Sequence, residues 1–89
     1  MKLYLTKGIN AKVADDGYFS YFITHSIKRH FNNDWAECEK EDAAANEQAL
    51  KDGSRLFSVY RFNEDVQTWI ITEAKPHRDI TTVLLPEDY

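Results

Sequence analysis

The sequence has little of three residue types that mark particular protein classes. Its single cysteine, Cys38, excludes an internal disulfide and any zinc site built from several cysteines. Three glycines and two prolines among 89 residues exclude a collagen-like repeat, a flexible linker and a low-complexity tail. No glycine-rich loop of the kind that holds phosphates is present. These absences leave the class of ordinary folded domains.

Long apolar runs are also missing, so the sequence predicts no transmembrane helix. The first residues after Met1 lack the apolar stretch of a signal peptide, and we therefore expect a cytoplasmic protein. Apolar content itself is ample: 43% of the residues are hydrophobic, including five Phe, five Tyr and two Trp. Because aromatic side chains each bury a large area, this is enough for one small core. We expect a single domain over residues 1–89.

Hydrophobic periodicity predicts an N-terminal strand followed by two helices. Residues 2–6 are β-prone, and Gly8 follows as a breaker. A helix over about 17–31 is predicted from apolar residues at helical spacing, Phe19, Phe22, Ile23, Ile27 and Phe31. A second helix ends at Asp52-Gly53. Its start is open between Glu41 and Asp34, where Asp34-Trp35-Ala36-Glu37 has the spacing of a capping box.

From Ser54 the period changes to two, which predicts strands over about 55–62, 66–74 and 80–85. Short connections between them indicate an antiparallel meander. The sequence therefore predicts an α+β fold of order β-α-α-β-β-β, with an antiparallel sheet and two helices packed on one face. The first strand pairs either beside the last strand or in the middle of the sheet.

Acidic residues are concentrated in one segment. Between Asp34 and Asp52 seven acids face two lysines, a net charge of −5, which exceeds the −4 of the whole chain. We interpret this segment as a surface that engages a protein partner with a basic, nucleic-acid-binding groove. The predicted partner-binding residues are Asp34, Trp35, Glu37, Glu39, Glu41, Asp42 and Glu47. The alternative is a solvated helix face whose acids complement the helix dipole.

Residue patterns for catalysis or metal binding do not form. Asp65 and Glu73-Ala74-Lys75 have the residue types of a nuclease metal site, but extended strand separates the two acids by about 26 Å. His25 and His30 are five residues apart on a helix and therefore lie on different faces. Cys38 is interpreted as a small buried hydrophobe. We expect no enzymatic activity, no cofactor and no metal.

Direct nucleic-acid binding is also not expected. The eleven basic residues form no stripe beyond Lys28-Arg29-His30, so few phosphate contacts are available. The aromatic residues of the strands are interpreted as core residues and cross-strand pairs rather than as a platform for bases. The C-terminal Pro86-Glu87-Asp88-Tyr89 is predicted to fold back on the core, with recognition by a partner as the alternative.

A set of short motifs runs through residues 34–89. It comprises Asp34-Trp35-Ala36-Glu37, Glu41-Asp42, Asn46, Ala49-Leu50, Gly53-Ser54-Arg55, Trp69–Ala74 and Thr81–Tyr89. In these motifs the chain resembles a family of short proteins carried by bacterial plasmids, prophages and other mobile elements, some labelled as restriction-modification related. Members tend to have glycine where Ala36 stands and a shorter connection than Lys75–Arg78. The N-terminal third matches only in outline.

The resemblance implies a context in which small proteins blunt host defence. Together with the acidic segment it leads us to expect a small non-enzymatic inhibitor of a host defence system, of the anti-CRISPR or anti-restriction kind. Its partner would be a nucleic-acid-binding defence complex. The alternative is a self-associating structural or regulatory module. That alternative follows from strands that are apolar on both faces, because helices on one face leave the other without cover.

Overall fold

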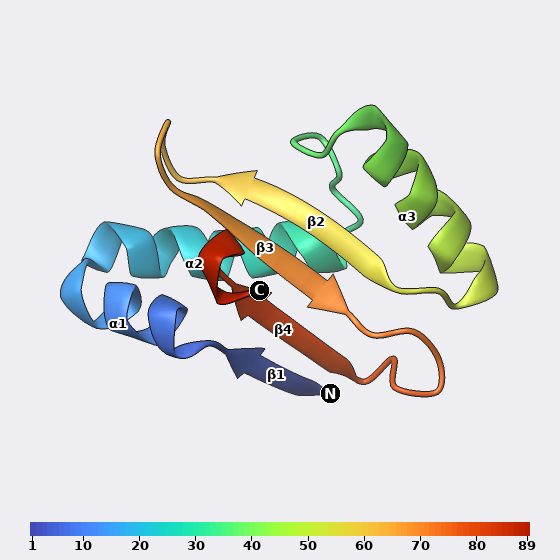
Figure 1. Cartoon of the computed structure of the whole chain (residues 1–89), viewed down its shortest axis with the longest axis horizontal. Coiled ribbons are helices and arrows are strands. Elements are labelled where there is room, and N and C mark those ends of the chain that lie inside the picture. Colours follow the sequence, from blue (N-terminus) through green and yellow to red (C-terminus); the bar gives the residue numbers. More distant parts are fainter.

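The computed structural model describes all residues from Met1 to Tyr89 and has an α+β fold (Figure 1). It contains a single four-stranded sheet, with helices behind the sheet and beside it. The elements are β1 (Lys2–Leu5), α1 (Lys7–Asp15), α2 (Gly17–Phe31), α3 (Lys40–Asp52), β2 (Leu56–Arg61), β3 (Gln67–Thr72), β4 (Ile80–Leu84) and the 3-10 turn η1 (Pro86–Asp88). None of the helices has the length and apolar character needed to cross a membrane.

The sheet is mixed rather than antiparallel. Its strand order is β1-β4-β3-β2; β2 and β4 pair antiparallel with β3, whereas β1 pairs parallel with β4, placing Lys2 opposite Ile80. The prediction of an antiparallel sheet was therefore wrong for β1. The reason is the path of α2, which carries the chain back along the sheet, so that β2 starts from the same end as β1 (Figure 1). Two hairpin reversals then give β4 the direction of β2 and hence of β1.

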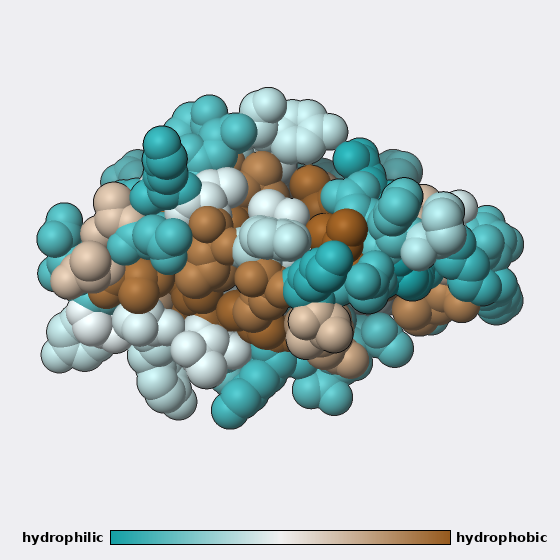
Figure 2. All heavy atoms as spheres, turned by 90° about the horizontal axis from the view of Figure 1, so that it is seen from below, coloured by the Kyte–Doolittle hydropathy of each residue, from teal (hydrophilic) through white to brown (hydrophobic).

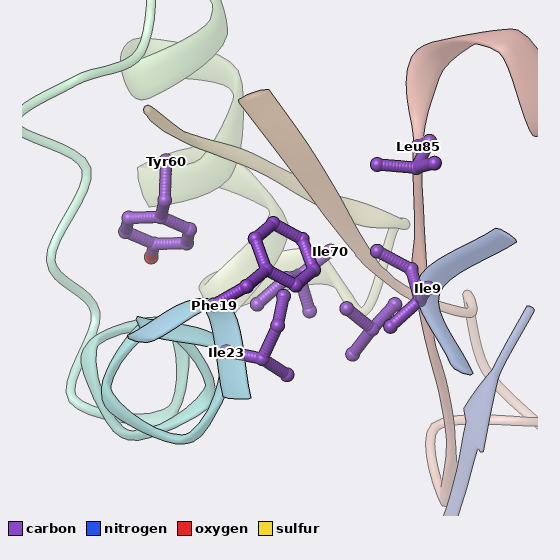
Figure 3. Packing of buried hydrophobic residues seen from close by; sticks show 7 residues of the cluster. Ile9, Phe19, Ile23, Tyr60, Ile70 and Leu85 are labelled. Atoms are coloured by element: carbon purple, nitrogen blue, oxygen red, sulfur yellow. The ribbon is translucent and has the colours of Figure 1, made fainter. Parts of the chain in front are cut away.

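The main core lies between the sheet and α1 and α2. Phe19 and Ile23 of α2 face Ile70 of β3, with Tyr60 to one side and Ile9 of α1 to the other (Figure 3). Each of these side chains is at most 3% exposed. Full burial of a large apolar side chain stabilises a fold by about 1.5–3 kcal/mol. The predicted apolar stripe of the helix over 17–31 is therefore confirmed from Phe19 to Ile27, whereas its last member, Phe31, is 43% exposed.

The nine-residue helix α1 was not predicted from the sequence. Its N-cap Thr6 accepts a hydrogen bond from the Ile9 N–H through its side-chain oxygen, and Asp16 ends α1 while capping α2 by accepting from the Tyr18 N–H. Gly8, interpreted as a breaker, lies inside this helix. A Cβ there would approach the Asp88 carboxylate to 2.8 Å, so any larger residue at this position would require the Asp88 side chain to shift.

Helix α3 begins at Lys40 and lies beside β2 at the edge of the sheet, not on the face that α1 and α2 cover (Figure 1). The prediction placed the helix over about 17–31 and the helix ending at Asp52-Gly53 on one face of the sheet. It was wrong for α3, because the helix that shares this face with α2 is the unpredicted α1. The Asn46 side chain attaches α3 to the strand: its amide donates to the Phe57 C=O at 2.7 Å and accepts from the Phe57 N–H at 3.0 Å. The capping-box spacing at Asp34 does not start a helix.

The opposite face of the sheet carries no long helix. The C-terminal residues turn back over β3, and the Tyr89 ring contacts Trp69 edge to face at a centroid distance of 5.8 Å. Trp69 in turn contacts Phe57 at 5.2 Å. The prediction that the tail folds back is confirmed, and we refer to this side of the sheet as the helix-free face.

Candidate functional site

The structure divides the predicted partner-binding residues into two groups. Asp34, Trp35 and Glu37 lie in the connection between α2 and α3, and their side chains are used within the fold. Glu39 is the N-cap of α3, and the remaining acids belong to the helix itself. The acidic segment is therefore not one uniform surface.

Arg29 of α2 holds the connection in place. Its Nε donates to Asp34 Oδ2 at 2.7 Å, its Nη1 donates to Glu37, and its guanidinium lies 4.8 Å from the centre of the Tyr60 ring. The hydrogen bond from Arg29 and the one from the Ala36 N–H lower the pKa of Asp34. The hydrogen bond to Asp34 raises the pKa of Arg29 despite the burial of the guanidinium. Two of the seven predicted residues thus form an internal ion-pair network.

The same connection and α3 together close the outer edge of β2. Glu37 Oε1 accepts a hydrogen bond from the Arg61 N–H at 2.9 Å, and the Asn46 side chain forms hydrogen bonds with both the N–H and the C=O of Phe57. Cys38 lies beside them and is half-buried rather than fully buried; its thiol donates to the Phe57 C=O at 4.0 Å, and burial raises the pKa of that thiol. We call this outer edge of β2, satisfied by Glu37, Cys38 and Asn46, the closed edge.

Trp35 is a core residue and not an exposed anchor. It is 8% exposed and packs with Ala49 and Leu56 in a second, smaller cluster. Its Nε1 donates to Glu47 Oε2 at 2.7 Å, and its ring meets His30 edge to face at 5.7 Å. Because a buried indole N–H needs an acceptor, Glu47 has a structural role even though it lies on the surface.

Three of the predicted acids remain without an internal partner. Glu39 and Glu41 are exposed and Asp42 is half-buried, and none of the three forms an ion pair or a side-chain hydrogen bond. They gather at the N-terminus of α3, where negative charge also complements the helix dipole. This free acidic group, Glu39, Glu41 and Asp42, is the part of the segment that is available to another molecule.

Sequence reasoning missed two exposed aromatic residues of α2. Tyr18 is 84% exposed and Tyr21 is 76% exposed, and the Tyr21 ring stacks on His25 with nearly parallel planes. The available signal was their position outside the apolar stripe of the helix, at a spacing of three residues. Aromatic side chains of this kind are enriched in protein interfaces.

His30 belongs to a buried polar network instead of a metal site. Its Nδ1 lies 2.6 Å from Ser58 Oγ and its Nε2 lies 2.8 Å from Thr72 Oγ1, which is bonded to Thr81. Burial lowers the pKa of His30 to about 4. Only neutral hydroxyl groups bond to the ring, so the network holds the uncharged imidazole between α2 and two strands.

Two shallow hollows of about 210 and 250 Å³ lie at the end of the molecule where α1 meets the β2–β3 connection. Both contain Lys12 and Val66; the first adds Asp15, Asp16, Phe19 and Phe62, and the second adds Asp65, Gln67, Leu85, Pro86 and Glu87. Nowhere in the chain do three or more His, Cys, Asp or Glu side chains converge in a way that could hold a metal ion.

Comparison of the chain with protein-family models, with curated protein sequences and with solved structures finds no match. The resemblance to mobile-element proteins therefore stays a prediction from the sequence motifs.

Proposed function

We propose that this chain is a small protein-binding domain that inhibits a host defence complex by occupying its basic, nucleic-acid-binding surface. The observation that carries the proposal is the free acidic group, Glu39, Glu41 and Asp42, at the exposed start of α3. Opposite charge on a partner would guide its approach and fix its orientation. The motif resemblance to proteins of mobile elements supplies the biological context.

The acids are presented by a firmly attached element. Asn46 fastens the middle of α3 to β2, and Arg78 donates to the Ala49 C=O at 2.7 Å and to the Ser54 C=O at 2.6 Å beyond its C-terminal end. Trp35 ties the preceding connection to Glu47. Because the helix is fixed before binding, little conformational entropy is lost when a partner docks, which favours affinity.

The test reverses the charge of the free acidic group. The triple variant Glu39→Lys, Glu41→Lys and Asp42→Lys is compared with a control that reverses three exposed acids elsewhere, Glu64→Lys, Asp65→Lys and Glu87→Lys. Each Glu or Asp to Lys exchange adds two charges, so both variants change the net charge by the same amount. Circular dichroism establishes that both are folded.

The readout is the set of bacterial nucleic-acid-binding proteins retained by each immobilised variant. We expect the natural sequence and the control to retain the same proteins, the α3 variant to lose them, and double-stranded DNA to elute them, because DNA competes for a basic surface. Retention by the α3 variant equal to that of the control overturns the proposal. Retention that DNA does not reduce overturns it as well.

A further inference from the structure

The outer edge of β1 has unpaired main-chain groups. The Lys2 N–H donates to the Asp79 C=O and the Thr6 N–H donates to the Val83 C=O, so the even-numbered residues face β4. Alternation along a strand therefore directs the N–H and C=O of Leu3, and the N–H of Leu5, away from the sheet. The Leu5 C=O accepts a long hydrogen bond of 3.4 Å from the Asn10 side chain. We call this edge of β1 the open edge.

Apolar side chains are exposed along the open edge. Met1 is 78% exposed, Leu3 is 41% exposed and Tyr4 is 53% exposed. From the side on which β1 lies, Figure 2 shows an apolar band across the middle of the molecule between polar margins. Natural edge strands are usually protected by charges, proline or a covering element, and here Lys2 is the only charge. An edge with free main-chain groups and an apolar border is suited to receive another strand.

We propose that the open edge binds a second copy of this chain, with the two β1 strands antiparallel about a two-fold axis at Leu3. In this register Leu3 exchanges both of its free main-chain hydrogen bonds with Leu3 of the second copy. The Leu5 N–H donates to the Met1 C=O of the second copy, and the reverse bond forms by symmetry. The outward-facing main-chain groups of the strand are thereby satisfied by its own sequence.

The side chains are also self-complementary in this register. Lys2 and Tyr4 lie on the helix-free face, so Lys2 of each copy is opposite Tyr4 of the other, where an ammonium group can lie against the ring. On the side of the sheet that α1 and α2 cover, Met1, Leu3 and Leu5 of one copy would contact Leu5, Leu3 and Met1 of the second copy. A strand of another protein would have to match this alternation, whereas a second copy matches it by symmetry. These pairings favour a second copy as the partner.

The contact involves few residues, so we expect a weak dimer with a dissociation constant of about 10–100 µM. Sedimentation equilibrium over a concentration range that spans these values measures it with the purified chain alone. Dimerisation measured in this way depends neither on the proposed inhibitor function nor on any other protein.

Two charge substitutions test the register, because the two-fold axis places position 3 opposite itself. Leu3→Lys and Leu3→Glu each place like charges directly opposite in the dimer, and we expect each variant alone to dimerise at least tenfold more weakly. An equimolar mixture of the two variants places opposite charges together, and we expect a heterodimer to form. Leu3 is already partly exposed, so either substitution leaves the core intact.

The matched control is Tyr18→Ser with Tyr21→Ser, which removes the other exposed aromatic patch and leaves β1 unchanged. We expect it to dimerise like the natural sequence. A monomer at every concentration overturns the proposal, as does a dimer that is lost in the tyrosine control but unaffected by Leu3→Lys. Failure of the Lys and Glu variants to associate on mixing, when both are folded by circular dichroism, overturns the two-fold register.

Discussion

The two outer edges of the sheet differ in whether their main-chain groups have hydrogen-bond partners. At the closed edge, side chains from a separate segment satisfy the main-chain groups of β2 at Phe57 and Arg61. At the open edge, the main chain of Leu3 has no partner and apolar side chains are exposed beside it. The acidic segment therefore has a structural role, since Glu37 and the helix that carries Asn46 belong to it. Its acids are therefore not interchangeable.

The largest expected effect comes from removing the amide at the closed edge. Asn46 is buried, so Asn46→Ala leaves the N–H and C=O of Phe57 without partners and shielded from water. We expect this substitution to lower the free energy of unfolding by about 2–4 kcal/mol. Urea denaturation measures the change, and hydrogen exchange should show faster exchange of the Phe57 amide. Gln48→Ala on the exposed side of α3 is the control, with an expected change below about 0.5 kcal/mol. Equal effects of the two variants would contradict the role of the closed edge.

Acid should weaken the β2 side of the molecule through His30. Its folded pKa of about 4 lies below the ordinary value of 6.5, so the folded state holds the neutral ring. Stability is therefore complete above pH 6.5 and falls as the pH drops toward 4, by up to about 3 kcal/mol. Denaturant midpoints at several pH values measure this loss. His30→Gln should remove most of the slope in this window, whereas His25→Gln at an exposed position should leave it unchanged.

Two substitutions of Glu37 separate its charge from its hydrogen bond to the strand. Glu37→Gln removes the ion pair with Arg29 but keeps an oxygen that can accept from the Arg61 N–H, and we expect a loss of about 0.5–1 kcal/mol. Glu37→Ala removes both interactions, with an expected loss of about 1–2 kcal/mol. Thermal or urea denaturation compares the two. If the variants are equally stable, the hydrogen bond to Arg61 contributes nothing to the closed edge.

The smallest effect on monomer stability is expected at the open edge. Leu3→Pro removes an N–H that points away from β4, so we expect a loss below about 1 kcal/mol. Tyr4→Pro removes an N–H that faces β4, and its expected cost is about 2–3 kcal/mol. Urea denaturation at concentrations well below the expected dimer range makes the comparison. A larger loss for Leu3→Pro than for Tyr4→Pro would show that the outward direction is assigned to the wrong residues.

Elements with a strong hydrophobic period were predictable from the sequence, whereas features that depend on contacts between distant segments were not. The stripe that begins at Phe19 and the alternation around Ile70 led directly to α2 and β3. Helix α1 offers only Ile9 and Val13 as core contacts in nine residues, too few for a periodic signal. The parallel pairing of β1 follows from the path of α2, which no local pattern encodes.

The concentration of acids at the candidate site was predictable from the sequence. Which of these residues have partners within the fold and which are free was not. Composition alone located the segment between Asp34 and Asp52. That Asp34 and Glu37 are occupied depends on Arg29, which approaches from another helix. That Trp35 is buried depends on Leu56 of β2. Both sets of contacts join segments that are distant in the sequence. The sequence alone therefore could not distinguish these structural residues from the free acids Glu39 and Glu41.

The closed edge limits the number of copies that can join through their sheets. A sheet that is open at both sides can add copies without limit and grow into a fibre. Here Asn46 and Glu37 occupy one side, so a chain that joins at β1 presents only another closed edge to the solvent. Growth therefore terminates after one addition, and the fold carries its own protection against polymerisation.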